Sequence, residues 1–306
     1  MPWYGTAQVD VSRWAEQIYF RQHGTKIIRL FLWPGRWVAM LFSQDEISRI
    51  GCGFRDSADR EIRVLPPNTA AREHMLGTPT TNRLLDGVAA DELERLRPHL
   101  EEVPLVQRQT INAPGAAIEQ IYFPISGAVS LIASLDEGTA VEVGLIGPEG
   151  MVGTPVLLGS ETASNEAFVQ LAGTALRVAT GVLLDAVDQS PGLRRRLLRY
   201  AQALSFQIAQ SAACNARHVV EERCARWLLA AHDRVDGNQL ALTHEFLGVM
   251  LGVRRAGVTV AAGSLQQAGL IRYRQGQVTV LDREGLEAAA CECYRITRDE
   301  YARLLD

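Results

Sequence analysis

Residues 242–255 read Leu-Thr-His-Glu-Phe-Leu-Gly-Val-Met-Leu-Gly-Val-Arg-Arg, and they predict how the C-terminal part of the chain folds. Thr243 is a residue type that caps helix N-termini, so we expect a first helix to begin directly after it. Gly252 makes the turn, and a second helix is expected from about Arg254 to Ala268. Two helices joined by a tight glycine turn form a helix-turn-helix.

The residues on either side complete a winged domain. Residues 270–274 and 277–281 are β-like runs that flank Gln275-Gly276, a pair that favours a tight β-hairpin and therefore a wing. Upstream, residues 221–231 have helical spacing and residues 239–242 form a short strand.

The charge of this segment favours contact with nucleic acid. The whole chain has a net charge of −4, which excludes a uniformly basic nucleic-acid coat but allows a local positive face. Residues 246–281 contain no acidic residue, and their arginines are Arg254, Arg255, Arg272 and Arg274. Taken alone, two arginines at a helix start are as often ordinary solvent-exposed residues as they are DNA contacts. The turn, the wing and the missing acids favour a recognition helix, whose N-terminal end meets base edges in the major groove.

The middle of the chain has short β-like runs separated by glycine and proline. The runs cover residues 103–107, 118–123, 128–133, 140–145, 167–171 and 175–179. Several strands at this spacing predict a small antiparallel sandwich or barrel. Ahead of them, Leu84 and the leucines that follow it have helical spacing, which predicts a short helical lead-in.

A helical period returns after Pro191. Apolar residues then recur at intervals of four, three and four, which is the spacing of a coiled-coil seam. These residues are Leu197, Ala201, Leu204 and Ile208. The stripe either packs against the same helix of a second copy or covers the β domain of its own chain, and periodicity alone favours neither.

The first 74 residues differ from the rest. They contain four of the five tryptophans, and no long stretch keeps a helical or a strand period. Pro66-Pro67-Asn68-Thr69 has the composition of a linker, and a well-patterned sequence follows Met75. We therefore expect residues 1–74 to be an atypical extension, disordered or produced by a misassigned start, with Met75 as the natural first residue.

Length and composition exclude several classes of protein. A chain of 306 residues with 47% hydrophobic and 22% charged residues has room for two ordinary domains and is neither disordered nor fibrous. The longest apolar-looking run, residues 27–42, is interrupted by Arg29, Pro34 and Arg36, so it is too short for a membrane span. No secretory signal is visible at Met1, and we expect no membrane association and a cytoplasmic location.

The order of the parts and the motif at residues 242–255 resemble the CRP/FNR family of bacterial transcription regulators, over about residues 81–281. The resemblance implies an α+β fold: an antiparallel, jelly-roll-like β-roll sensor over residues 75–190, a long dimerisation helix over 191–217 and a winged helix-turn-helix over 218–306. It implies a homodimer, which we expect Leu197, Ala201, Leu204 and Ile208 of the long helix to hold together. It also implies that the dimer binds double-stranded DNA at a palindromic operator, contacts RNA polymerase and responds to a small-molecule effector.

The resemblance also implies residue roles. Arg255 falls where the family places its guanine-contacting arginine, and Thr243 falls where a helix start meets a phosphate. We expect Arg254 and Thr259 to lie close to the bases, and the candidate phosphate contacts are Thr243, His244, Arg272 and Arg274. Ala256 stands where many members carry a glutamate and Gly257 where a threonine is common, so the operator is expected to differ from that of the cyclic-AMP receptor.

The effector pocket departs from the family pattern. Gly153-Thr154 stands where cyclic-nucleotide binders carry a glycine and a glutamate, and Asn165-Glu166 stands where they carry an arginine and a serine or threonine. A carboxylate facing a phosphate is repulsive, and no nearby cation replaces the arginine. Cyclic-AMP binding is therefore disfavoured, and the effector is unknown.

Metal and catalytic motifs are weak or missing. An iron–sulfur sensor needs grouped cysteines near the N-terminus, where Cys52 stands alone. Cys291-Glu292-Cys293 lacks a neighbouring histidine and is expected on a helix that separates its side chains, so we predict a structural role. His244-Glu245 lacks the second histidine of a zinc protease, and residues 105–185 contain neither histidine nor cysteine. We expect no metal, no cofactor and no catalytic residues.

The sequence thus predicts a DNA-binding regulator rather than an enzyme. The alternative is a ligand-binding β-roll protein whose C-terminal domain recognises another protein.

Overall fold

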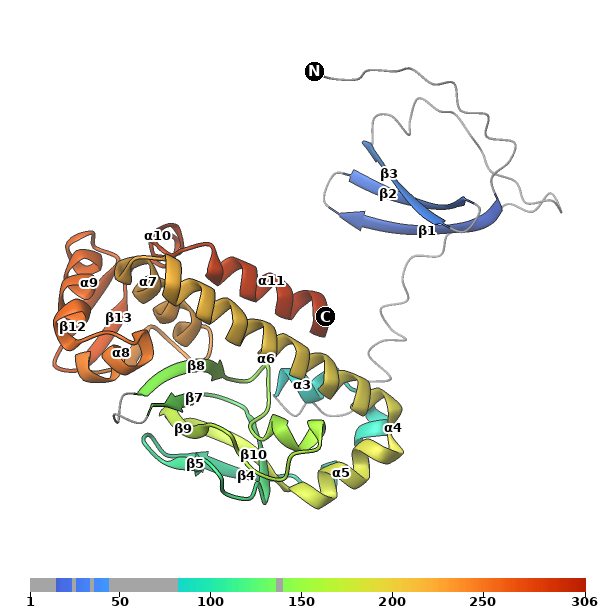
Figure 1. The fold of residues 1–306 in the computed structure, drawn as a ribbon, viewed down its shortest axis with the longest axis horizontal. Coiled ribbons are helices and arrows are strands. Elements are labelled where there is room, and N and C mark those ends of the chain that lie inside the picture. Colours follow the sequence, from blue (N-terminus) through green and yellow to red (C-terminus); the bar gives the residue numbers. More distant parts are fainter. Residues whose placement is uncertain (1–14, 24–25, 34–35, 44–81, 136–139) are drawn as a thin grey trace. The chain divides into compact units, whose positions relative to one another are not determined.

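The computed structural model describes residues 15–23, 26–33, 36–43, 82–135 and 140–306 and divides the chain into two compact units, 1–68 and 69–306 (Figure 1). In the first unit three strands form an antiparallel sheet in the order β1-β2-β3, namely β1 (Ala15–His23), β2 (Lys26–Trp33) and β3 (Arg36–Ser43). The sequence pattern did not predict this sheet, because the run around β2 is apolar almost throughout and lacks period-two alternation. Met75 and Cys52 lie outside the described residues.

The β-roll of the second unit is built from two antiparallel sheets, as the spacing of the runs predicted. One sheet has the order β4-β10-β6 and the other β5-β9-β7-β8. The strands are β4 (Glu101–Leu105), β5 (Thr110–Asn112), β6 (Gln120–Pro124), β7 (Ala128–Ser134), β8 (Ala140–Ile146), β9 (Glu166–Leu171) and β10 (Gly173–Ala179). Only β5 was missed, since three residues are too few to show a period.

Short helices pack on the β-roll and contribute leucines to its core. Asn82 caps α3 (Arg83–Asp86) by accepting a hydrogen bond from Leu85 N at 3.1 Å, and its amide donates to Pro124 O at 2.7 Å. Leu84 and Leu85 are thereby held in the core. The remaining short elements are α4 (Ala90–Leu93), η2 (Arg97–His99), η3 (Thr154–Leu158) and α5 (Thr180–Gln189).

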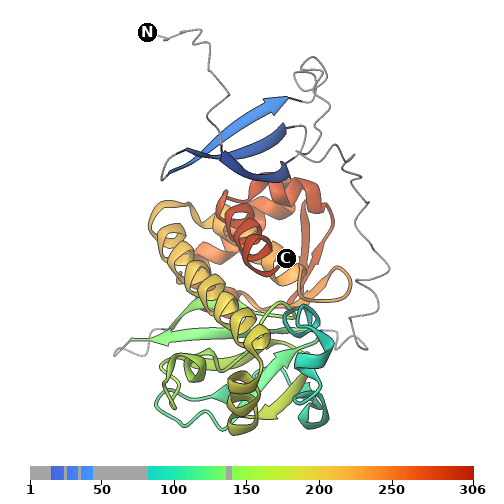
Figure 2. The same cartoon turned by 90° about the vertical axis from the view of Figure 1, so that its right-hand side faces the viewer.

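Helix α6 (Pro191–Arg217) runs over the β-roll, and α11 (Cys293–Leu305) lies along it in the opposite direction (Figures 1 and 2). Leu197 is 0%, Ala201 9% and Leu204 5% exposed, and Leu197 and Leu204 belong to the β-roll core together with half-buried Ile208. Of the two alternatives for this stripe, the structure follows the second: the stripe covers the β domain of its own chain. Leu197 and Leu204 are therefore enclosed within the chain, whereas Ile208 keeps part of its side chain exposed.

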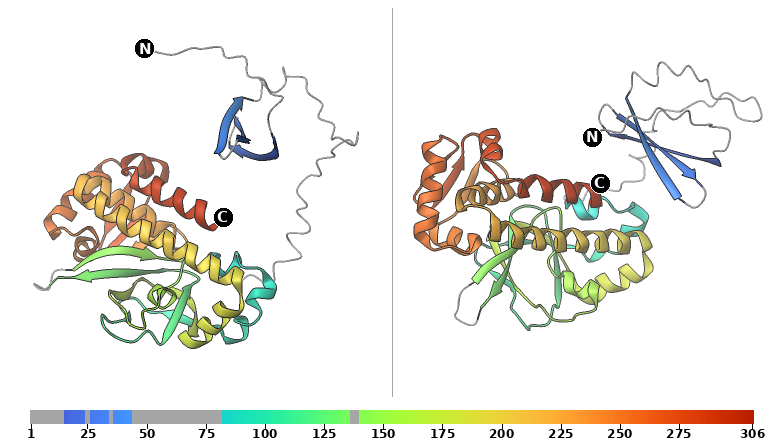
Figure 3. Two further views of the ribbon diagram at one scale, coloured as in Figure 1. Left: turned by 45° about the vertical axis from the view of Figure 1, so that its right-hand side comes forward. Right: turned by 45° about the horizontal axis from the view of Figure 1, so that its top comes forward.

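The winged helix-turn-helix is located at the far end of α6 (Figure 3). Its sheet has the order β11-β13-β12. Its elements are α7 (Val220–His232), β11 (Gln239–Ala241), α8 (His244–Leu251), α9 (Arg255–Gln267), β12 (Ile271–Arg274), β13 (Gln277–Val280) and α10 (Arg283–Ala289). The predicted elements of this domain are all present, with ends within about two residues of those expected.

Within the described residues, no single helix has the length and apolarity needed to cross a membrane. The pair α8 and α9 reaches that apolarity only when taken together, and it is bent by 102°.

Candidate nucleic-acid interface and ligand cavity

Helix α8 begins and ends as its sequence predicted. The Thr243 hydroxyl accepts a hydrogen bond from Phe246 N at 3.2 Å, which satisfies one of the free amides at the helix start. Gly252 ends the helix in the left-handed region, with φ of 60°. A Cβ at Gly252 would also approach Val141 Cγ2 to 2.6 Å, so both the turn and the neighbouring β-roll strand require glycine here.

Helix α9 presents its N-terminal end to solvent. Arg254 is its N-cap, and Arg254, Arg255 and Thr259 are exposed. Its opposite face is buried, with Val258 at 0% and Leu265 at 4% exposure. The apolar residues of α9 therefore face inward, and the two arginines at its start lie outside.

His244 connects α8, α9 and the wing. Its ring stacks on that of Tyr273 with centroids 4.1 Å apart, and its Nδ1 lies 3.1 Å from Thr259 Oγ1. Burial and the nearby charge of Arg255 lower the pKa of His244, which favours the neutral ring. Nε2 is buried without a hydrogen-bond partner among the described residues. In the structure the His244 ring packs between Tyr273 and Thr259, and its phosphate contact stays a prediction.

The wing carries two arginines on one face. Arg272 and Arg274 are exposed and stand two residues apart on β12, so they share a face of the strand, while Tyr273 between them points to His244. Tyr273 N also donates to Gln266 Oε1 at 2.7 Å, which fastens the wing to α9. The predicted contact residues are thus divided among the start of α8, the first turns of α9 and the adjoining wing.

The winged domain packs on the β-roll through contacts that the sequence did not reveal. Trp227 of α7 donates to Glu142 of β8, and Phe246 of α8 contacts Phe168 with ring centroids 6.2 Å apart. Arg108 from the β-roll lies over the Phe246 ring at 4.7 Å. The sequence contained one indication of this contact, because Glu142 is a single charge within an otherwise apolar strand. Its partner, however, comes from α7, about 85 residues later in the chain.

A cavity of about 410 Å³ lies between the β-roll and α6, at the position of the expected effector pocket. Gly153, Thr154 and Asn165 line it as the resemblance implied, but Glu166 does not line it and instead accepts a hydrogen bond from Thr110 Oγ1 at 3.0 Å. The other lining residues are mainly apolar, and among the described residues that line the cavity there is no arginine, lysine or carboxylate. The cavity therefore offers no charge to an anionic phosphate, in agreement with the sequence.

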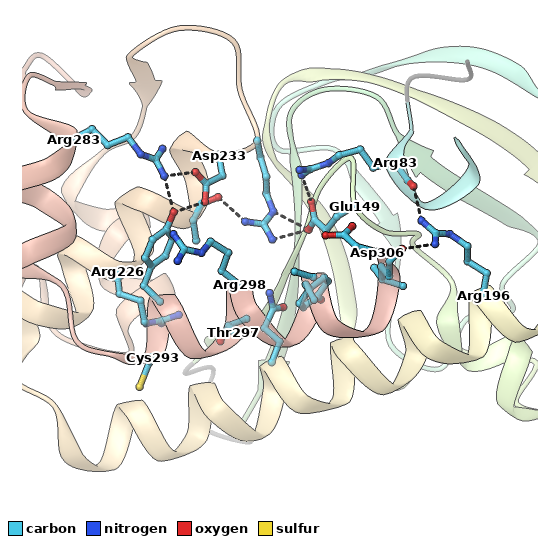
Figure 4. A pocket seen from close by; sticks show the side chains of 17 residues that line it. Arg83, Glu149, Arg196, Arg226, Asp233, Arg283, Cys293, Thr297, Arg298 and Asp306 are labelled. Carbon is cyan, nitrogen blue, oxygen red and sulfur yellow. Dashed lines mark hydrogen bonds and ion pairs between the residues drawn. The ribbon is translucent and has the colours of Figure 1, made fainter. Parts of the chain in front are cut away.

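A second cavity, of about 420 Å³, lies between α6, α7 and α11 and is rich in arginine (Figure 4). Its charges are largely neutralised within the protein. Arg234 pairs with Glu149 at 2.6 Å, and Arg283 pairs with Asp233 at 2.6 Å. Arg196 donates to backbone carbonyls, among them Leu84 O at 2.8 Å. These contacts give the cavity a structural role in joining the β-roll, α6 and the winged domain.

Two family profiles match the chain: the cyclic nucleotide-binding domain over residues 102–190 and the Crp-like helix-turn-helix domain over residues 222–289. The transcriptional regulator SdrP of Thermus thermophilus is 29% identical over 181 residues, which cover 56% of this chain and 84% of that protein. The structure of FixK2 from Bradyrhizobium japonicum is 19% identical, with a TM-score of 0.55, and covers 63% of this chain and 98% of its own.

A CRP-family transcriptional regulator from Thermus thermophilus is likewise 19% identical, with a TM-score of 0.51, and its structure covers 61% of this chain and 96% of its own. The two solved structures share the fold. The two matched domains stand in the same order as the β-roll and winged domain described above. On these grounds the chain belongs to the CRP/FNR family of transcription regulators.

Proposed function

We propose that this regulator binds a specific, two-fold symmetric DNA site as a homodimer, with the start of α9 in the major groove and the wing on the backbone. The observation that carries the proposal is the exposure of Arg254 and Arg255 at the N-terminal end of α9, within a segment that has no acidic residue. Arginine at this place can bond guanine O6 and N7 together. Arg272 and Arg274 on the exposed face of β12 suit phosphate contacts.

The dimer would form through a different face of α6 from the one that the sequence indicated. A second stripe of exposed residues on this helix also recurs at intervals of four and three, one position further along. They are Leu198, Gln202, Ser205, Ala209 and Ala212. Leu198 is 42% exposed, and the small residues after it allow two helices to approach closely. A homodimer would place two recognition helices in successive major grooves roughly 34–36 Å apart.

The effector would be an uncharged, mainly apolar small molecule bound between the β-roll and α6. The cavity there has apolar walls with a few polar side chains, among them Thr154 and Asn165. Leu204 and Ile208 of α6 form part of its wall, so a bound molecule would touch the helix that leads to the winged domain. Contact with RNA polymerase is proposed on the family resemblance alone. A protein that binds an operator on the bacterial chromosome would be located in the cytoplasm.

Selection of bound sites from random duplex DNA tests the proposal. The full chain is expected to enrich a palindrome, and a gel shift on that site is expected to survive competitor DNA while weakening with salt. The rival function, protein recognition by the winged domain, predicts no enriched sequence and equal binding to scrambled and selected duplexes. Adding a small-molecule extract in a parallel selection would show whether the effector is needed.

A further inference from the structure

Four potential metal ligands meet at the junction of α6, α7 and α11. Cys214 is in the last turns of α6, and His218 is the residue at which that helix ends. Cys293 is the first residue of α11, and Cys291 lies two residues before it. One ligand atom from each lies within 4.8 Å of all the others. In the sequence, Cys291-Glu292-Cys293 lacks a neighbouring histidine, and the fold supplies both that histidine and a third cysteine.

The distances between these atoms fit one tetrahedral ion. Cys214 Sγ and Cys291 Sγ are 3.5 Å apart, and Cys293 Sγ and His218 Nδ1 are also 3.5 Å apart. With Zn–S bonds of about 2.3 Å and a Zn–N bond of about 2.0–2.1 Å, tetrahedral geometry separates two sulfurs by about 3.8 Å and a sulfur from a nitrogen by about 3.6 Å. The ligands are too close together to surround an iron–sulfur cluster.

The groups around the ligands match the outer shell of a zinc site. The other ring nitrogen of His218, Nε2, lies 3.2 Å from a carboxylate oxygen of Glu292, and such a carboxylate commonly orients a metal-bound histidine. Gln210 Nε2 lies 3.1 Å from Cys293 Sγ, where it donates to the sulfur. Arg226 is close enough to act electrostatically on Cys214, so its positive charge would offset the surplus negative charge of three thiolates around a divalent ion.

Packing alone does not account for this group of side chains. Cys224 represents the ordinary buried cysteine: it is 0% exposed among apolar neighbours in the core of the winged domain. Cys214, Cys291 and Cys293 instead form a small cluster separate from both apolar cores, and their fourth neighbour is an imidazole. The His218 side chain is 20% exposed, which leaves a route for an ion to enter.

We propose that Cys214, His218, Cys291 and Cys293 bind one Zn²⁺ ion, which fastens the end of the long helix α6 to the start of α11. The ion would hold the His218–Val219 connection, across which the chain passes from α6 to α7 of the winged domain. This site is separate from the β-roll cavity and from the arginines of α9 and the wing, so it does not depend on the function proposed above.

Titration of the reduced, metal-free full chain with Co²⁺ and then Zn²⁺ tests the proposal. We expect one Co²⁺ per chain, with the visible bands of tetrahedral cobalt and a sulfur-to-cobalt charge-transfer band in the near ultraviolet. Zn²⁺ should bleach both, since nitrogen and sulfur sites bind it more tightly than Co²⁺. Absence of these bands, or the spectrum of octahedral cobalt, would overturn the assignment.

Variants assign the ligands. Cys214→Ser should weaken or remove the charge-transfer band, and His218→Ala, at the most exposed ligand, should weaken binding while keeping the sulfur band. Glu292→Gln should lower the zinc affinity by about 10–100-fold with an unchanged spectrum. The matched controls are Cys224→Ala and Glu284→Gln, which should bind as the natural chain does. Full binding by Cys214→Ser and His218→Ala, or equal losses in the controls, would contradict the proposed site.

Discussion

Trp227 Nε1 donates a hydrogen bond of 2.7 Å to Glu142 Oε1, and the two side chains belong to different domains. The second carboxylate oxygen of Glu142 accepts a hydrogen bond from Ser130 Oγ at 2.6 Å. Burial raises the pKa of Glu142 from 4.5 to about 7, despite the opposing effects of these hydrogen bonds and of Arg226 and Arg234. A carboxyl group that changes charge near neutral pH therefore lies where the winged domain packs on the β-roll.

The stability of the protein should fall as pH rises from about 4.5 to about 7. In that range the folded state keeps the Glu142 proton while the unfolded state has lost it, so the folded state binds more protons and rising pH favours unfolding. A pKa difference of this size corresponds to a loss on the order of 3 kcal/mol. Urea unfolding at a series of pH values measures it.

Glu142→Gln should remove most of that dependence, because an amide can accept from Trp227 and donate to Ser130 without a charge. Above pH 7 this variant should be more stable than the natural chain. Glu161→Gln, at an exposed position, is the control and should leave the pH profile unchanged. A slope that persists in Glu142→Gln would show that other groups cause it.

Glu149 and Arg234 form a second link between the domains, 2.6 Å apart with side chains 12% and 9% exposed. Arg234→Met should destabilise the protein by about 3–5 kcal/mol, because it leaves the Glu149 carboxylate buried without its closest cation. Adding Glu149→Gln should recover part of the loss, and chemical denaturation of the four members of this double-mutant cycle measures the coupling. Additive losses would show that the pair does not act as a unit.

Arg255 and Arg272 should affect DNA binding in different ways. Arg255→Ala should relax the preference for one guanine in each half-site, at a cost of about 1–3 kcal/mol on the preferred sequence. Arg272→Ala should weaken binding to all sequences alike. It should also reduce the slope of the logarithm of the binding constant against the logarithm of the salt concentration by about one. Site selection and salt titration with both variants provide the comparison, and an unchanged base preference in Arg255→Ala would refute its assigned role.

The two faces of α6 should respond differently to substitution. Ala209→Glu places a charge on the exposed face and should convert a dimer to folded monomers, as measured by analytical ultracentrifugation. Leu197→Ala creates a cavity in the β-roll core and should cost about 2–5 kcal/mol of stability, because Leu197 is fully buried. Arg199→Glu serves as the charge control, because Arg199 is exposed but follows Leu198 directly and therefore points about 100° away from it around the helix. If the Ala209→Glu variant remained dimeric, the dimer interface would lie on another surface.

The order and type of the elements in the second unit were readable in advance because each rests on local chemistry: Thr243 caps α8, Gly252 turns the chain, and short runs between glycines form the β-roll. The exposure of Arg254 and Arg255 followed from the same pattern. Which face of α6 is buried could not be read, since two stripes with the same spacing stand one residue apart and only the position of the β-roll decides between them. The thiols and imidazole at the end of α6 are up to 79 residues apart in the chain, and the Glu142–Trp227 pair 85 residues apart. Only the packing of distant segments brings such groups together, because local propensity acts over a few residues, whereas burial and ligand geometry depend on neighbours from the whole chain.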